Sequence, residues 1–302
     1  MTVPDLAPDV VGGTERPEEP DWPKRMRWIL ILVIGLPYIW GVLGLELSWG
    51  AIGRAPGQIW GLLGGLLPPD WSDISRSFNK LLESIYVAWI ATIIGAVFSF
   101  PLGFMAATNM APGWLTGPVR GLLSGIRAFP ELVLAIVLIP AFGLGPFTGV
   151  LAIGIHSIGT LGKLTSEVVE GVDPGPIEAV KATGGTRFQA MRFGGVPQAM
   201  PNILAYWLYR FEINIRASAV LGMIGAGGIG AEIVGRLRFR DDWPKAGAAL
   251  ILTIVVVLII DAISAGIRRR IIAGHPGTGP VSRALGTIIG DVTPPTVETR
   301  EA

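Results

Sequence analysis

The run AALILTIVVVLII at 248–260 decides the fold class of this chain. It follows the glycine-rich stretch GAGGIG at 225–230, whose Gly-x-Gly-x-x-Gly spacing matches the dinucleotide-binding fingerprint of soluble oxidoreductases. That fingerprint uses an acidic residue about 20 positions further on to hold a ribose hydroxyl. Here Asp241 and Asp242 come too early, and the uncharged run 248–260 occupies the required place. The glycine-rich stretch therefore does not indicate a dinucleotide-binding oxidoreductase.

The composition is that of a membrane protein. Of 302 residues, 50% are hydrophobic and only 16% are charged, whereas soluble domains carry about 25% charged residues. The net charge of +1 gives no basic field for nucleic acid, so no nucleic-acid partner is expected. The absence of cysteine excludes disulfides, thiolate metal sites and cysteine nucleophiles. Because the two histidines, His156 and His275, lie far apart, we expect neither a metal site nor catalytic residues.

Six segments are long and apolar enough to span a bilayer, which needs about 20 mostly apolar residues. The predicted fold is therefore an all-α integral membrane protein of about six transmembrane helices. The predicted spans are 28–47, 85–106, 122–142, 147–164, 202–224 and 246–267.

Positive residues set the predicted orientation, because cytoplasmic loops retain Lys and Arg. KRMR at 24–27 precedes the first span and RRR at 268–270 follows the last, which predicts that both termini are cytoplasmic. The apolar stretch IWGLLGGLL at 59–67 is too short to cross and predicts a periplasmic amphipathic helix. The expected domains are a disordered cytoplasmic tail 1–27, the first span with the periplasmic segment 28–81, a core transmembrane domain 82–272, and a cytoplasmic tail 273–302.

The predicted cytoplasmic loop 170–198, EGVDPGPIEAVKATGGTRFQAMRFGGVPQ, contains two short helical patterns. Pro176 suits the first turn of one helix, Gly184–Gly185 interrupts it, and Thr186 can cap a second. Pro197 then opens the fifth span. A helix, glycine elbow and helix suits docking into a groove of another protein; the alternative is an ordinary connecting loop.

This loop resembles the EAA motif of permease subunits in ATP-binding-cassette importers. The resemblance rests on EAV at 178–180, a glycine at 184 and VP at 196–197. Val180, Gly194 and Val196 stand where that motif usually has alanine, isoleucine and leucine. The resemblance implies a coupling helix that sits in a cleft of the ATPase subunit, with Glu178, Ala179, Gly184 and Pro197 as the coupling residues.

Within that family the chain is most similar to the phosphonate-importer permease, over roughly 83–267. LYRFEINIRASAVLGMIGAGGIGAEI at 208–233 carries this similarity, with RFEINIR as its more specific part. The resemblance implies ATP-driven alternating access that moves a phosphonate or related phosphorus oxyanion across the bacterial inner membrane. It also implies a homodimer of permeases, two ATPase subunits and a periplasmic or lipid-anchored binding protein.

The chain has no G-x-x-x-x-G-K-[ST] sequence, so we expect no enzyme activity and assign ATP and Mg²⁺ to the partner ATPase. Because methionine and betaine permeases share the glycine-rich segment, methionine or another small solute is an alternative cargo. A secondary transporter is a third possibility, but it would usually show an inverted repeat between the halves of the chain.

Charged residues inside the predicted fifth span are candidates for the translocation pathway, because ionisable groups are costly at that depth. Arg210 and Asn214 share one helix face, and Glu212 and Arg216 nearly the opposite one. The spacing predicts an ion pair between Glu212 and Arg216, and another between Arg127 and Glu131. Arg210 has no acidic residue three or four positions away, which favours a role in attracting an anionic solute.

Four glycines complete the candidate site. Gly225, Gly227, Gly228 and Gly230 follow the predicted fifth span at its outer end. Glycine lets the backbone turn and approach other segments closely. We expect a bend or re-entrant segment there, beside the outer gate of the pathway.

Overall fold

A computed structural model describes residues 24–44 and 49–273 of the chain, and every regular element in these ranges is helical. The predicted tails 1–27 and 273–302 lie almost entirely outside the described residues. The chain divides into two units, 1–61 and 62–302. Helix α1 (Lys24–Gly44) belongs to the first unit, and α2 (Trp49–Leu66) contains the apolar stretch expected to form a surface helix.

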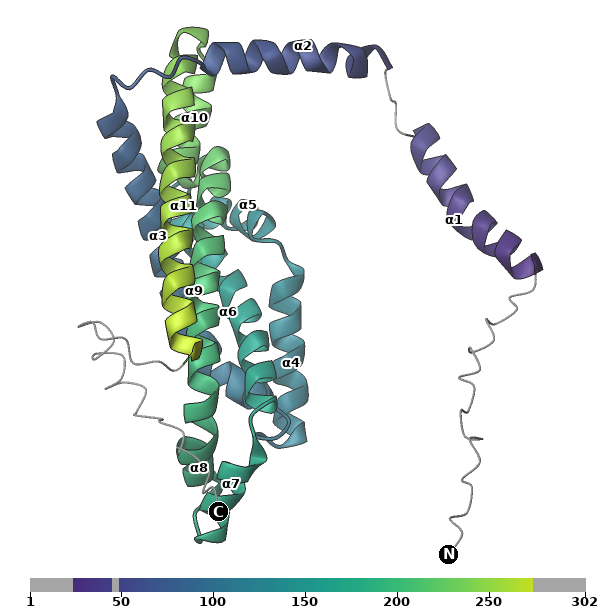
Figure 1. Ribbon diagram of the computed structural model, residues 1–302, viewed down its shortest axis with the longest axis vertical. Helices are drawn as coiled ribbons and strands as arrows, with labels where there is room; N and C mark the ends of the chain where they lie inside the picture. Colours follow the sequence, from purple (N-terminus) through teal and green to yellow (C-terminus); the bar gives the residue numbers. More distant parts are fainter. Residues whose placement is uncertain (1–23, 45–48, 274–302) are drawn as a thin grey trace, which may run out of the picture. The chain divides into compact units, whose positions relative to one another are not determined.

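The second unit is a bundle in which long helices run side by side, with α7 and α8 at one end and α10 towards the other (Figure 1). Short π-helical turns cover Met191–Gly195 and Gly222–Ala226, and a 3₁₀ turn covers Arg240–Asp242. The α-helices are α3 (Ile74–Ala106), α4 (Gly113–Ala128), α5 (Glu131–Phe142), α6 (Pro146–Glu170), α7 (Pro174–Ala182), α8 (Arg187–Ala190), α9 (Val196–Leu221), α10 (Gly228–Leu237) and α11 (Trp243–Ala273).

The structure confirms an all-α membrane protein. Within 24–44 and 49–273, four helices are individually long and apolar enough to cross a bilayer, and the number of candidate spans rises to six if each of two bent helix pairs counts as one span. The predicted second span lies within α3, which begins eleven residues earlier, at Ile74, and ends at the same residue. The predicted third span is wrong as one continuous helix, since α4 and α5 meet at an angle of 86°. Phe129 is extended there because Pro130 follows it, and a residue before proline avoids the helical region.

Small side chains allow α3 and α6 to pack closely through the centre of the bundle. A Cβ added at Gly95 would lie 2.5 Å from Cβ of Ser157, and one added at Gly103 would lie 2.5 Å from Cβ of Thr165. In membranes, close helix contacts of this kind supply much of the packing energy, because lipid tails are as apolar as leucine. The buried apolar residues of these two helices that pack in one cluster are Val87, Ala91, Val150, Ala152 and Ile153.

Candidate functional site

Local sequence signals build the α7–α8 elbow. Asp173 caps α7 by accepting a hydrogen bond from the Gly175 N–H at 2.9 Å, and Pro174 occupies the first helical position. Gly184 then turns the chain with a φ of 84°, a conformation that favours glycine. Thr186 caps α8 in a capping box with Gln189. The predicted interruption and second cap of the loop are confirmed. The predicted start at Pro176 is two residues too late, because Asp173 caps the helix and Pro174 takes the first helical position.

Tertiary contacts that the sequence did not predict hold this elbow against α9. Gln198 donates to the backbone carbonyls of Asp173 at 3.1 Å and Gly194 at 2.6 Å, and it accepts from the Asp173 N–H. Gly194 packs so closely on α7 that an added Cβ would lie 2.9 Å from the Ile177 backbone. This contact explains why glycine stands where the motif usually has isoleucine.

The predicted coupling residues differ in their exposure. Glu178, Ala179 and Gly184 are exposed, whereas Pro197 is half-buried in the first turn of α9. Phe188 of α8 is 72% exposed, which is unusual for a phenylalanine outside the lipid-facing helices. A largely apolar groove of about 680 Å³ lies between the elbow and the ends of α3 and α4, with Glu178, Lys181 and Arg187 among its lining residues.

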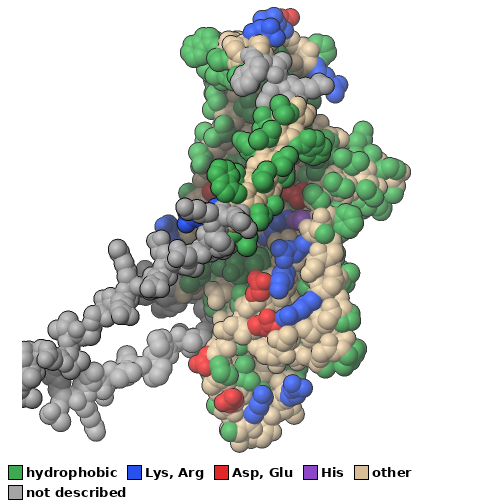
Figure 2. Space-filling view, turned by 90° about the vertical axis from the view of Figure 1, so that its right-hand side faces the viewer, with side chains coloured by type: hydrophobic (Ala, Val, Ile, Leu, Met, Phe, Trp, Pro, Cys, Tyr) green, Lys and Arg blue, Asp and Glu red, His purple; other side chains and the backbone are tan. Residues whose placement is uncertain are grey.

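The kind of side chain on the surface of the bundle changes along its length. Charged side chains gather on the half of one face towards α7 and α8, while hydrophobic side chains cover much of the half towards α10 (Figure 2). An apolar belt beside a charged end is the surface that a bilayer and an aqueous phase require.

A buried polar cluster joins α3, α6 and α9 at mid-bundle. Nε of Arg210 donates to Ser157 Oγ at 3.0 Å, and the Asn214 amide donates to Ser157 Oγ at 3.1 Å and Thr92 Oγ1 at 2.8 Å. Asn214 is fully buried and Arg210 is 5% exposed. The predicted shared face of Arg210 and Asn214 is confirmed, and it points into the bundle.

One guanidinium nitrogen of Arg210 makes no hydrogen bond to a described residue. Its Nη2 is buried and has no hydrogen-bond partner, and within the described ranges no carboxylate lies within ion-pair distance of it. The Glu131 carboxylate lies 3.6 Å from Nε2 of His156. The predicted Arg127–Glu131 pair is therefore wrong: the bend after Ala128 places the two residues on different helices.

The predicted Glu212–Arg216 pair is also wrong, because α11 supplies a separate partner to each residue. Glu212 Oε1 lies 2.7 Å from Nη1 of Arg268, and Arg216 pairs with Asp261. The Arg268 guanidinium also stands over the Tyr209 ring at 5.7 Å. These ion pairs fasten α9 to α11, and they give Asp261 a partner that its position in the sequence did not reveal.

The glycine-rich stretch forms the predicted bend, which turns the chain by 55° between α9 and α10. Gly225, Gly227 and Gly228 have φ values of 107°, 79° and 69°. Gly230 has another reason to be glycine, since an added Cβ would lie 1.9 Å from the Ala219 carbonyl oxygen. Conformation and space therefore both require glycine here.

Two residues of α3 hold this bend, and sequence reasoning missed both. Glu83 Oε1 accepts a hydrogen bond from the Gly228 N–H at 3.1 Å, and Ser84 Oγ accepts one from the Ile229 N–H at 2.9 Å. They satisfy the first free N–H groups of α10, where a carboxylate is also favoured by the helix dipole. The available signal was a carboxylate next to a serine at the start of an apolar span.

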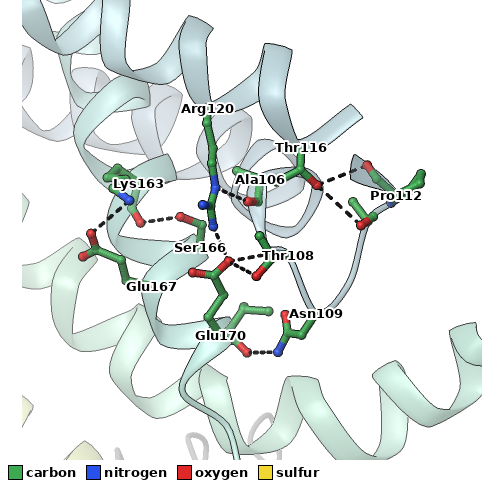
Figure 3. A network of polar contacts seen from close by, with 12 residues as sticks. Ala106, Thr108, Asn109, Pro112, Thr116, Arg120, Lys163, Ser166, Glu167 and Glu170 are labelled. Carbon is green, nitrogen blue, oxygen red and sulfur yellow. Dashed lines mark hydrogen bonds and ion pairs between the residues drawn. The ribbon is translucent and has the colours of Figure 1, made fainter. Parts of the chain in front are cut away.

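A second missed cluster lies beside the elbow, at the end of α6 (Figure 3). Glu170 Oε1 accepts from the Thr108 N–H at 2.6 Å, from Thr108 Oγ1 at 2.7 Å and from Arg120. Arg120 Nε also donates to the Ala106 carbonyl at 2.8 Å. This cluster joins α3, α4 and α6 at the point where the chain enters α7.

Curated relatives of the chain are transport permeases. The phosphite transport system permease protein PtxC of Stutzerimonas stutzeri is 39% identical over 209 residues, which are 69% of this chain and 76% of that protein. The putative cryptic phosphonate transport system permease protein PhnE2 of Escherichia coli (strain K12) is 42% identical over 122 residues, which are 40% of this chain and 99% of that protein.

The fold and the family agree. A methionine ABC transporter, MetNI, in an inward-facing conformation superposes with a TM-score of 0.57 at 20% identity, covering 63% of this chain and 94% of that chain. The family model for binding-protein-dependent transport system inner membrane components matches residues 99–273. That match takes in the elbow, the glycine bend and three members of the polar cluster, Ser157, Arg210 and Asn214. The chain therefore belongs to the family of inner membrane components of binding-protein-dependent transport systems.

Proposed function

We propose that this chain is the permease subunit of an ATP-binding-cassette importer that moves phosphonate, phosphite or a related phosphorus oxyanion into the cell. The observation that carries the importer assignment is the α7–α8 elbow, a capped and exposed helix pair at one end of a membrane-spanning bundle. The similarity to PtxC and PhnE2, whose names specify phosphite and phosphonate, supports the cargo class.

Energy would come from a separate ATPase subunit that binds ATP and Mg²⁺. The elbow would dock into a cleft of that subunit, with Glu178 and Ala179 on its exposed side and Gly184 setting the turn. Two copies of the chain would pair across the pathway, and a periplasmic or lipid-anchored binding protein would deliver the solute. This arrangement places the α7–α8 end and both termini in the cytoplasm, in agreement with KRMR before the first span and RRR in the last turns of α11.

Arg210 would attract the anion inside the membrane. Ser157 holds its Nε, while Nη2 keeps an unused donor. A buried, unpaired donor is costly, so a second acceptor that arrives during transport would bind strongly. A tetrahedral phosphorus oxyanion can supply such an oxygen, and an arginine beside Asn214 matches its charge and hydrogen bonding.

Glu212 and Arg216 would contribute through their ion pairs to α11, which keep the fifth span in register beside this donor. The outer gate would be formed by Gly225, Gly227, Gly228 and Gly230, because their bend leads into α10 in the half of the bundle opposite the elbow (Figure 1).

Uptake of labelled methylphosphonate by cells with and without the gene tests this function, with unlabelled phosphonate, phosphite, phosphate and methionine as competitors. We expect cells without the gene to lose uptake of the labelled compound. In cells with the gene, we expect only phosphorus oxyanions to compete with that uptake. Competition by methionine, or loss of methionine uptake alone, would retain the permease and overturn the cargo. Unchanged uptake of every one of these solutes would overturn the function.

A further inference from the structure

We propose that Glu170 is the positioning residue that transmits movement of the docked elbow to helix α4, through its bonds to Arg120 and Thr108. This inference rests on the proposed coupling of α7 and α8 to an ATPase subunit. It assigns the transmission to one carboxylate that lies outside both the coupling motif and the membrane-embedded charges.

The position of Glu170 in the chain is the first part of the argument. It is the last residue of α6, and α7 begins at Pro174. Any displacement of the elbow therefore reaches this carboxylate through the short connection 171–173. The same connection is tied to α9 by Gln198, so the elbow and the ends of α6 and α9 form one continuous piece.

The hydrogen bonds of Glu170 are the second part. One oxygen, Oε1, accepts three hydrogen bonds, two from Thr108 and one from Arg120. Thr108 lies in the turn between α3 and α4, and Arg120 lies at the middle of α4. Through this single atom, the end of α6 is joined to both neighbouring segments (Figure 3).

Further contacts make the joined segments rigid. Arg120 donates through Nε to Ala106, the last residue of α3, so its guanidinium is fixed on two sides. The Asn109 amide donates to the Val169 carbonyl at 2.8 Å, directly before Glu170. A planar guanidinium held by two acceptors resists displacement better than a flexible ammonium would.

The route continues from α4 into the bundle. Helix α4 leads through the bend at Phe129–Pro130 into α5, whose residue Ala135 packs in one cluster with Leu221 and Ala226 at the glycine bend. A rigid α4 can thus transmit movement of the elbow to the glycine bend. Coupling of this kind needs packed elements that are in contact with one another. Helix α6 provides one such route from the elbow, and α4 together with α5 provides a second.

Glu170→Gln tests the inference, because glutamine keeps the shape and one acceptor oxygen but loses the charge that Arg120 requires. Glu167→Gln is the matched control. Glu167 lies on the same helix, and its only ion pair with a described residue is with Lys163, on α6 itself, at 3.2 Å. The assay uses the full complex with its ATPase and binding protein in proteoliposomes. It measures phosphite or methylphosphonate uptake and ATP hydrolysis in the same sample.

We expect Glu170→Gln to lower the solute transported per ATP hydrolysed by about fivefold or more, the lower limit typical of allosteric coupling. Glu167→Gln should leave this ratio unchanged. A purely structural role would reduce uptake and hydrolysis together, because fewer complexes would be active, and the ratio would stay constant. A constant ratio in Glu170→Gln would therefore overturn the inference.

Two further variants keep the test decisive if Glu170→Gln assembles poorly. Thr108→Val removes one donor and retains the backbone N–H, so a smaller loss of the ratio is expected from it. Arg120→Gln combined with Glu170→Gln should lower the ratio no further than the worse single change, because both disrupt one interaction. Additive losses would overturn the inference. Failure of the unaltered complex to transport either solute would instead contradict the proposed function.

Discussion

The Glu212 carboxylate on α9 lies 2.7 Å from the Arg268 guanidinium on α11, although Arg216 stands one turn away from it on its own helix. The Glu212 side chain is 7% exposed and that of Arg268 24%. Arg216 reaches Asp261 on α11 instead. Two ion pairs therefore join α9 to α11, and neither Glu212 nor Arg216 pairs with a residue of its own helix.

The first prediction concerns this interhelical contact. Arg268→Gln leaves the Glu212 carboxylate buried without a cation, so we expect a loss of about 3 kcal/mol in unfolding free energy. Arg216→Gln should cost less, because the Asp261 side chain that it leaves without a cation is 29% exposed, against 7% for Glu212. Thermal unfolding in detergent micelles measures both. The combined change Glu212→Gln with Arg268→Gln should recover part of the loss, and equal effects of the two single arginine changes would contradict the assignment.

The second prediction concerns the glycine bend. Gly227→Ala forces a φ of 79° on a residue with a side chain and places its Cβ 2.5 Å from Glu83 Oε1. We expect a cost of about 2 kcal/mol and a lower melting temperature. Gly235→Ala is the control, because Gly235 lies within α10 with no atom within 4 Å of the added Cβ. The control should be neutral or stabilising by up to about 1 kcal/mol, and equal melting temperatures for the two variants would show that the bend tolerates side chains.

The third prediction concerns the unused donor of Arg210. Arg210→Gln should raise the solute concentration needed for half-maximal uptake by about tenfold or more, the loss expected for one charge-assisted hydrogen bond. Arg210→Lys should retain part of the affinity, because it keeps the charge without the planar fork. Arg127→Gln, an exposed change on α4, serves as the control. If Arg210→Gln transported with unchanged affinity, the anion would not use this residue.

The fourth prediction concerns docking by the elbow. Glu178→Arg reverses an exposed charge on α7, so we expect it to weaken capture of the ATPase subunit and to abolish uptake. Asp241→Arg makes the same reversal on an exposed residue of the 3₁₀ turn after α10, at the far end of the bundle. Co-purification of the ATPase with each variant is the measurement. Equal capture by both variants would move the docking surface away from α7.

The fifth prediction tests why Gly194 departs from the motif. Gly194→Ile restores the usual residue, but its Cβ would lie 2.9 Å from the Ile177 backbone. We expect the elbow to separate from α9 and to become a preferred site of proteolysis. Limited proteolysis of the purified protein, with cleavage mapped within 170–198, measures this. The unaltered protein is the reference, and an unchanged cleavage pattern would show that α7 can shift to accept the side chain.

The sequence was informative wherever the decisive interactions are local. The caps at Asp173 and Thr186 and the turn at Gly184 depend on residues only a few positions apart, and the positive φ values at the Gly227 bend require glycine at those positions themselves. The apolar runs likewise determine that the chain enters a membrane, because the cost of transferring charged residues into lipid depends on composition alone. The fold class and the bends in 170–198 and 225–230 could therefore be predicted without coordinates.

Ion-pair partners could not be predicted in the same way. Spacing on one helix allowed a Glu212–Arg216 pair, but α11 offers Arg268 and Asp261 at positions set by the packing of two helices remote in sequence. The three donors to Glu170 come from residues 50 and 62 positions away. The sequence by itself determined an all-α membrane protein with a capped elbow and a glycine bend. Only the tertiary structure decided which charges meet, because that depends on how neighbouring helices are placed and turned.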